Sequence, residues 1–232
     1  MKNKIKVFNF IAIVLIFTLS ATSCSGQSGG GKSLNSAEEL KKYLDSQPAN
    51  SPDKPIKVSM TINDPMLKNV VDVIKSAGKY VSLNITGNAL TTIPSRAFIN
   101  CETLVGVTIP DSVTGIGDRA FANCTKLISV TIGNSINSIG LFAFGSCTSL
   151  TSITIPSSVT RINLGAFYDC NNLTSVTFQG TISSDNLMII IGGGEMLSPF
   201  DGDLRAKYLA GDIGTYTTTA PVDSKNSKWT KK

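Results

Sequence analysis

Hydrophobic positions recur every 23 residues between residues 90 and 178, and this repeat is the dominant pattern of the chain. Each unit has a short alternating segment, a second apolar pair after a turn, and then a small, a large and a small side chain. The large position is filled in turn by Phe98, Phe121, Phe144 and Phe167. A fixed period of about 20–29 residues predicts a solenoid, whose stacked units bury a continuous core that one unit could not bury alone.

Each unit predicts its own local structure. Its first arm, such as residues 104–109, ends in alternating apolar and polar positions, which predicts a short strand with one buried face. Pro110 follows and predicts a turn. After an apolar return arm, Ala120, Phe121 and Cys124 have the spacing of a single helical or 3₁₀ turn.

Residues 34–86 precede the repeats and predict two helices and two strands. Ser36 and Glu39 match a capping box at the start of the first helix. A second helix begins at Pro65 and runs to Ala77. Alternating apolar positions predict two strands, at residues 56–62 and 80–85. We expect these elements to form an N-terminal capping region that closes the apolar end of the solenoid.

Residues 181–232 lose the repeat register, and we expect a C-terminal capping region there. The apolar run at residues 187–191 is too short to cross a membrane, and it predicts a strand or loop buried against the last unit. Residues 199–210 predict a closing helix with apolar positions at helical spacing, Leu204, Tyr208 and Leu209. We expect an edge strand at residues 215–219, and we expect Trp229 to pack against this cap.

The repeated pattern Ala-Phe-x-x-Cys-x-x-Leu, with its following strand and turn, resembles the BspA-like leucine-rich repeats of bacterial surface proteins. Residues 109–124 give the clearest match, and the resemblance covers about residues 83–180. The turn residues of the pattern are replaced at Gly133, Asn163 and Gln179. The resemblance implies surface display and protein binding, including, for some members of the family, adhesion to host proteins, and it implies no catalytic residues. The predicted fold class is an α/β leucine-rich repeat solenoid with repeats at residues 87–180, an α/β N-terminal cap and a helical C-terminal cap.

Residues 1–23 have the pattern of a signal peptide, with Lys2, Lys4 and Lys6 before an apolar stretch. Small residues before Cys24 resemble the bacterial lipoprotein signal, which implies that Cys24 becomes the lipid-bearing first residue. Secretory cleavage without a lipid and an uncleaved anchor are the alternatives. Ser25 rather than Asp follows the cysteine. By the resemblance to bacterial lipoproteins, this residue implies that the protein is located in the outer membrane or at the cell surface.

Residues 24–33 are rich in Gly and Ser and predict a flexible tether. The spacing from Gly26 to Gly31, Lys32 and Ser33 formally matches a phosphate-binding loop. Such a loop needs a preceding strand to hold its amides around the phosphates, and here a signal peptide precedes it. We therefore expect no nucleotide binding.

Composition narrows the function classes. The chain has 232 residues, of which 41% are hydrophobic, and this is enough for a domain with a substantial core. Its net charge is +5, and loss of the three leader lysines lowers it to +2, which is not the balance of a nucleic-acid-binding protein. The absence of His excludes Ser-His-Asp and Cys-His catalysis and His metal ligands. We expect no enzyme activity, no cofactor and no metal.

Four cysteines recur at one position of the repeat: Cys101, Cys124, Cys147 and Cys170. Equivalent residues in neighbouring units should lie about 5 Å apart, so that distance alone allows disulfides or a thiolate metal site. The spacing is not that of a zinc-binding pair, and cysteine commonly packs as a small buried hydrophobe. Buried free thiols are the favoured interpretation.

The outward positions of the predicted strands form an uncharged face that could bind a partner: Asn84, Gly106, Thr108, Ser129, Thr131, Ser152, Thr154, Ser175 and Thr177. Threonine also favours strands for purely structural reasons. Leu141 and Phe142 differ from the polar or glycine-containing pairs of other units, and they indicate either local packing or an exposed contact.

Two function classes remain. The first is a lipid-anchored cell-envelope repeat protein that binds another macromolecule, with a host or envelope protein as the expected partner. The second is a structural or antigen-like repeat domain without a specific ligand. A regular face of this kind favours binding over catalysis.

Overall fold

The computed structural model describes residues 32–187, 203–211, 213–222 and 227–232, all within one compact unit. The predicted signal peptide, Cys24 and the tether up to residue 31 lie outside the described residues. So do the apolar run after Leu187 and the first residues of the predicted closing helix.

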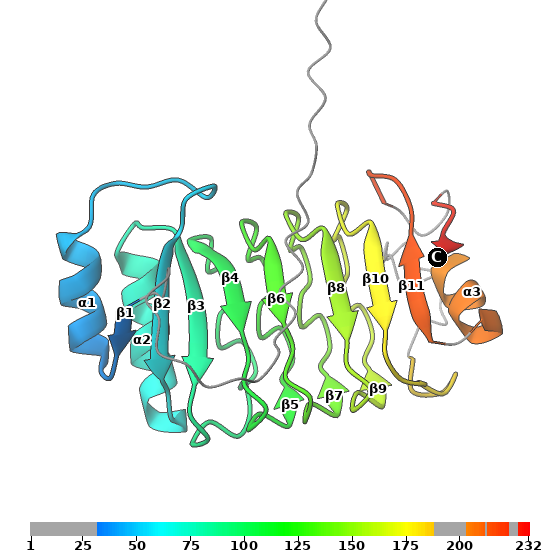
Figure 1. The fold of residues 1–232 in the computed structure, drawn as a ribbon, viewed down its shortest axis with the longest axis horizontal. Coiled ribbons are helices and arrows are strands. Elements are labelled where there is room, and N and C mark those ends of the chain that lie inside the picture. Colours follow the sequence, from blue (N-terminus) through cyan, green and yellow to red (C-terminus); the bar gives the residue numbers. More distant parts are fainter. Residues whose placement is uncertain (1–31, 188–202, 212, 223–226) are drawn as a thin grey trace, which may run out of the picture. The chain divides into compact units, whose positions relative to one another are not determined.

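The repeats form successive coils whose first arms pair as parallel strands (Figure 1). These strands are β4 (Leu104–Thr108), β6 (Ser129–Thr131), β8 (Ser152–Ile155) and β10 (Ser175–Phe178). Gly106 pairs with Ser129, and Ser152 pairs with Ser175, so that paired residues lie one repeat apart in the sequence. β4 and β6 belong to a five-stranded sheet and β8 and β10 to a four-stranded sheet, and β6 and β8 lie next to each other.

The return arms form a second parallel sheet that the sequence pattern did not predict. Its three strands have two residues each: β5 (Gly115–Ile116), β7 (Ser138–Ile139) and β9 (Arg161–Ile162). The following segment is a pair of tight turns and not one helical turn. The Cys124 N–H donates to the Phe121 carbonyl oxygen at 3.2 Å, but Arg119 and Asn123 have φ of 55° and 60°, and this left-handed backbone interrupts a helix.

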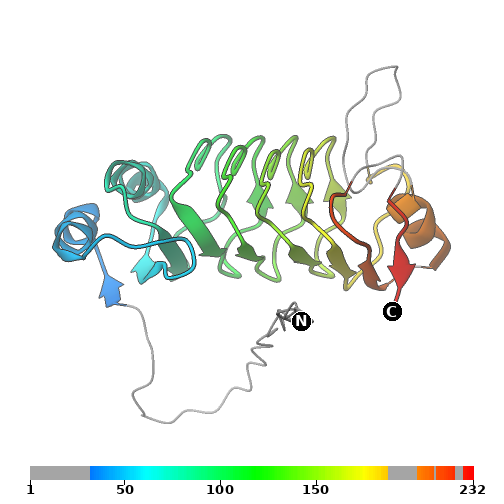
Figure 2. The ribbon, with the colours of Figure 1, turned by 90° about the horizontal axis from the view of Figure 1, so that it is seen from above.

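The elements before the coils extend the first sheet in the order β1-β2-β3-β4-β6. They are β1 (Lys32–Leu34), α1 (Ala37–Ser46), β2 (Ile56–Thr61), α2 (Asp64–Ser76) and β3 (Val81–Thr86). The prediction of a flexible tether at residues 24–33 is wrong for its last two residues. Lys32 and Ser33 belong to β1 and pair with Val58 and Ser59 of β2. In Figure 2, α1 and α2 lie on the same side of the strands as the turns of the coils.

Side chains at the two helix starts explain where these helices begin. The Ser36 hydroxyl accepts the Glu39 N–H at 3.1 Å, as the predicted capping box requires. The Glu39 carboxylate accepts the N–H of Asn35 and not that of Ser36. At α2 the cap is Asn63, whose side-chain oxygen accepts the Met66 N–H at 3.0 Å, and Pro65 lies in the first turn.

After the coils, the second sheet of long strands continues in the order β8-β10-β11-β12. The added elements are α3 (Asp203–Gly211), β11 (Gly214–Thr217) and β12 (Thr230–Lys231). The predicted edge strand is therefore interior, since β12 pairs on its outer side. Of the three apolar positions at helical spacing, Leu204 and Tyr208 are buried and Leu209 is 39% exposed, and Trp229 is buried.

Stacked aromatic rings run through the centre of the coils. Phe98, Phe121, Phe144 and Phe167 are fully buried, and neighbouring ring centres lie 4.8, 5.1 and 5.3 Å apart with interplanar angles of 11° or less. Leucine, isoleucine and valine side chains of every coil surround this stack. Since each such side chain contributes roughly 1.5–3 kcal/mol on burial, the core is the main stabilising term. Within the described residues, none of the helices has the length and hydrophobicity needed to cross a membrane.

Candidate binding surfaces

The predicted strand face is assembled in register from both sheets. Ser82, Gly106 and Ser129 occupy one row across β3, β4 and β6, and Asn84, Thr108 and Thr131 occupy the next row. On β8 and β10, Ser152 pairs with Ser175 and Thr154 with Thr177. The structure therefore brings all nine predicted face residues onto the outward side of adjacent strands.

Exposure differs along this face. Ser129, Thr131, Ser152 and Thr154 are exposed, whereas Asn84, Thr108, Ser175 and Thr177 are half-buried. Gly106 is buried and corrects its predicted role as a contact residue. A Cβ atom at Gly106 would lie 2.7 Å from the Ser82 Oγ and 2.9 Å from the Ser129 Oγ, so the flanking hydroxyls close over the glycine.

The face extends beyond the residues that the repeat pattern identified. Ser33 and Ser59 continue one row onto β1 and β2, where the Asn84 Nδ2 donates to the Ser59 Oγ at 3.2 Å. Thr215 on β11 continues it on the other side, with its hydroxyl 2.8 Å from that of Thr177. These residues belong to no repeat, so their register became visible only with the pairing of the strands.

The chemistry of the face is uniform. Apart from Gly106, its outward positions carry hydroxyl or amide groups, and Lys57, which pairs with Ser82, adds a charge at one end. Hydroxyl groups both donate and accept hydrogen bonds, but they are weak bases and weak nucleophiles unless an adjacent base activates them. The arrangement is suited to forming many neutral hydrogen bonds with a partner.

The four repeat cysteines are buried free thiols. The Sγ atoms of Cys124, Cys147 and Cys170 each donate to a backbone carbonyl oxygen of the preceding coil, at 3.2, 3.2 and 3.1 Å. Desolvation raises the pKa of every one of these thiols, that of Cys170 to about 12. Neutral, hydrogen-bonded thiols of this kind are poor nucleophiles and poor metal ligands.

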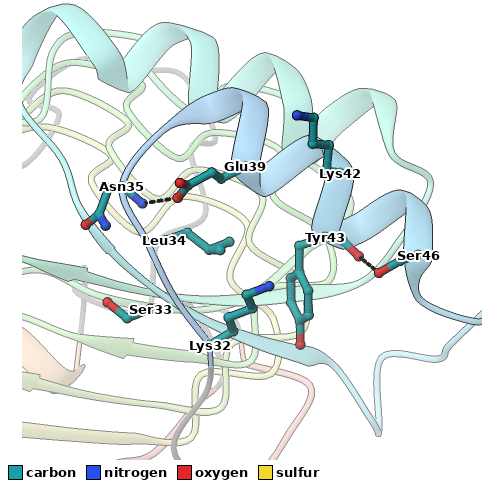
Figure 3. A pocket seen from close by; sticks show the side chains of 8 residues that line it. All are labelled: Lys32, Ser33, Leu34, Asn35, Glu39, Lys42, Tyr43 and Ser46. Carbon is teal, nitrogen blue, oxygen red and sulfur yellow. Dashed lines mark hydrogen bonds between the residues drawn. The ribbon is translucent and has the colours of Figure 1, made fainter.

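A cleft of about 400 Å³ lies between β1 and α1 (Figure 3). The Lys32 Nζ lies 5.1 Å from the centre of the Tyr43 ring, and the Glu39 carboxylate is turned toward the backbone of Asn35. The Glu39 contact stabilises the start of α1, and the Lys32–Tyr43 contact joins β1 to the second half of that helix. Across the described part of the chain, no three His, Cys, Asp or Glu side chains are grouped so that they could hold a metal ion.

The repeats match a known family model. Residues 75–186 match the BspA type leucine rich repeat region in six copies. This part of the chain is a BspA-type leucine-rich repeat region. The BspA-type match begins in helix α2 and ends shortly after β10, so it includes β3 as well as the coils.

Solved structures of bacterial leucine-rich repeat proteins are similar to this chain. One from Bacteroides capillosus ATCC 29799 is 39% identical over 40% of this chain and 65% of that protein, with a TM-score of 0.37. One from Bacteroides ovatus ATCC 8483 is 30% identical over 50% of this chain and 27% of that protein, with a TM-score of 0.40. The leucine rich repeat protein of T. pallidum is 27% identical over 56% of this chain and 67% of that protein, with a TM-score of 0.36.

The chain spans less than two thirds of the Bacteroides proteins that it resembles. None of the curated proteins compared with it matches it. BspA-type repeats are typical of bacterial surface proteins, and the family is one of repeat proteins without a general catalytic activity.

Proposed function

We propose that this chain is a cell-envelope protein, anchored through a lipid on Cys24, that binds another macromolecule through its strand face. The resemblance to BspA-like surface proteins makes a host or envelope protein the first partner to test. The elements on either side of the coils serve to close the two ends of a solenoid with 23-residue units. The competing proposal is a structural or antigen-like domain that has no specific ligand.

The observation that carries this proposal is the continuity of the uncharged outward rows. One row runs from Ser33 on β1 through Thr131 on β6, and Thr154, Thr177 and Thr215 carry the same chemistry across the neighbouring sheet. Fold stability requires only the inward side of each strand to be apolar, so it does not require hydroxyl groups on almost every outward position. A repeated surface chemistry on a rigid scaffold is the usual basis of binding by repeat proteins.

Lipid anchoring rests on the sequence alone. The leader of basic and apolar residues ends in small residues before Cys24, and the Gly- and Ser-rich segment that follows could hold the domain away from a membrane. Ser25 favours the outer membrane or the cell surface.

A charge placed on the strand face tests the binding proposal. Thr131→Lys and Thr154→Lys together add two charges where the face is exposed, and desolvating them in an interface would be costly. Asn137→Lys is the control, because Asn137 is an exposed residue next to the second sheet, and its hydrogen bonds to other described residues involve its backbone N–H and carbonyl oxygen and not its side chain. Each protein is used to capture partners from envelope extracts and from host matrix extracts.

We expect the wild-type chain and Asn137→Lys to capture the same partner, and the double variant to lose it while its urea-unfolding midpoint stays unchanged. Capture that is equal for all three proteins would refute the strand face as the binding surface. Absence of any partner that is specifically retained would support the structural alternative.

A further inference from the structure

A second surface lies where each return arm passes into its turns. Residues of neighbouring coils at this corner are joined by backbone hydrogen bonds from Arg96 N to Asp118 O, from Arg119 N to Leu141 O and from Phe142 N to Leu164 O. Arg96, Arg119 and Phe142 have φ of 62°, 55° and 52°. These three residues, which we call the corner column, therefore follow one another at intervals of about 4.8 Å.

Phe142 is an unusual residue for such a position. Left-handed backbone is mainly adopted by Gly, Asn and Asp, and for a bulky side chain it is a genuine outlier. Its ring lies across Gly165 of the next coil, where a Cβ atom would come within 2.5 Å of the Phe142 Cε1. The ring is not buried in the core, since it is only partly covered at the corner.

Arginine and tyrosine side chains surround this ring. The Arg119 guanidinium lies 5.3 Å from the centre of the Phe142 ring, and the Tyr168 ring meets it edge-on at 5.8 Å. Leu141 and Leu164, which precede Phe142 and Gly165, are half-buried as well. Arg, Phe and Tyr are the residue types that are enriched at the centres of protein–protein interfaces.

The corner column leads into a cleft of about 340 Å³ between α2 and the first coil. Arg96, Lys75 and Leu67 line this cleft, together with Lys68, Asp64 and Asp72. Asp72 is paired with Lys68 at 2.5 Å. Arg96, Arg119 and Lys75 form no ion pair with any described residue.

The nearby carboxylates are already engaged. The Asp118 Oδ1 accepts the Leu141 N–H at 2.8 Å, and Asp64 accepts the Thr91 N–H and hydroxyl at 3.4 and 3.5 Å. The column thus offers the Arg119 guanidinium group beside the Phe142 ring and the Arg96 guanidinium group two coils away from that ring, and its cleft adds the ammonium group of Lys75. This combination is complementary to a chain segment that has carboxylates beside an apolar side chain.

We propose that the corner column binds an acidic segment of a partner protein, with an apolar side chain of that segment against Phe142 and its carboxylates against Arg119 and Arg96. A protein is favoured over an anionic polymer such as a nucleic acid because the aromatic and leucine side chains match an apolar anchor. This surface is separate from the strand face, whose outward side chains are mainly Ser and Thr and carry no aromatic ring or guanidinium group.

Peptide selection tests the assignment. Random dodecapeptides displayed on phage are selected on the full chain, and the enriched sequences are then measured against variants. Phe142→Asn removes the ring and keeps a residue that tolerates the left-handed backbone. Arg119→Gln removes the charge without changing the backbone, and it serves as the second variant if Phe142→Asn does not fold. Thr131→Lys on the strand face is the matched control.

We expect enriched peptides to have Asp or Glu next to an apolar residue. Phe142→Asn and Arg119→Gln should each bind them at least about tenfold more weakly, and Thr131→Lys should bind them like the wild type. Selection of no peptides, selection of peptides without carboxylates, or equal binding to all variants would overturn the assignment. Loss of binding in Thr131→Lys alone would also overturn it, and that result would support the strand face instead. Self-association of the full chain that Phe142→Asn abolishes would identify a second copy as the occupant and equally refute the inference.

Discussion

Truncation of one ring in the aromatic stack is the most direct probe of how the coils are held together. Phe144 is fully buried, and its ring lies parallel to Phe121 at 5.1 Å and to Phe167 at 5.3 Å. Removing a buried apolar side chain of this size forfeits about 1.5–3 kcal/mol of transfer free energy. Each lost aromatic pair adds about 0.5–1.5 kcal/mol. Phe144→Ala should therefore lower the free energy of unfolding by about 3–5 kcal/mol, as is typical for buried aromatic truncations.

The same stack supplies a matched comparison. Phe98 is also fully buried, but it has one stacked phenylalanine neighbour, Phe121 at 4.8 Å. Phe98→Ala should consequently cost about 0.5–1.5 kcal/mol less than Phe144→Ala. Phe142→Ala, which removes a ring that is only half-buried at a left-handed position, should cost less than either.

Urea unfolding followed by circular dichroism measures these differences, provided that the slope of the free energy against urea concentration is the same for all variants. A Phe144→Ala cost below about 1 kcal/mol, or one equal to that of Phe142→Ala, would refute the stacked register. A change in slope with little change in midpoint would instead indicate that the coils unfold separately, and the comparison would then be made on hydrogen-exchange protection of each coil.

Three further predictions concern the buried thiols, the close approach of neighbouring coils and the lipid anchor. Stability should fall above pH 9, because the thiols titrate near 9.0 in the unfolded chain, whereas burial raises the pKa of Cys170 to about 12 and also raises the pKa of Cys147, so that alkaline pH favours the unfolded chain. The urea midpoint should therefore decline between pH 8 and pH 10.5, and Cys147→Ala should make this decline less steep. Thiols that are already ionised in the folded chain would give no such decline. Gly140→Ala should destabilise by about 1–3 kcal/mol, since a Cβ atom would lie 2.6 Å from the Gly117 carbonyl carbon, and a neutral result in thermal unfolding would contradict this close approach of the coils. Cys24→Ala should move the protein out of the detergent-soluble membrane fraction, and an unchanged fractionation would show that Cys24 carries no lipid.

Sequence reasoning succeeded where a repeated position has one structural meaning. The phenylalanine, cysteine and leucine series predicted buried ladders because only an apolar side chain can occupy the interior of every coil, and these residues are buried. The parallel pairing of the first arms follows from stacking equivalent segments, and the strand pairs show it. The start of the first helix after Ser36 was visible because a capping residue is a local signal, and Pro65 located the second helix to within one residue of its start at Asp64, although its cap, Asn63, was missed.

The missed features depend on contacts between units and not on the pattern within a unit. Two-residue strands such as β5 are too short to give an alternating signature, so the second sheet could not be predicted. The burial of Gly106 depends on the rotamers of serines in both neighbouring strands. Strand β1 was missed because its Gly-rich surroundings indicated a tether, while edge pairing with β2 determines its conformation.

The corner column shows why deviations from a repeat carry more functional information than the repeat itself. Stacking places every surface residue of one coil about 4.8 Å from its equivalent in the next, so a position that serves only the fold can hold the same tolerated residue in each coil. At the corner the fold requires left-handed backbone, which Gly165 satisfies without strain. Phe142 occupies the equivalent position at an energetic cost in its backbone conformation. The contacts of its ring with Arg119 and Tyr168 compensate only part of that cost. A side chain that is unfavourable for the backbone, and that remains partly exposed, is better explained by a contact outside the chain than by the packing of the coil.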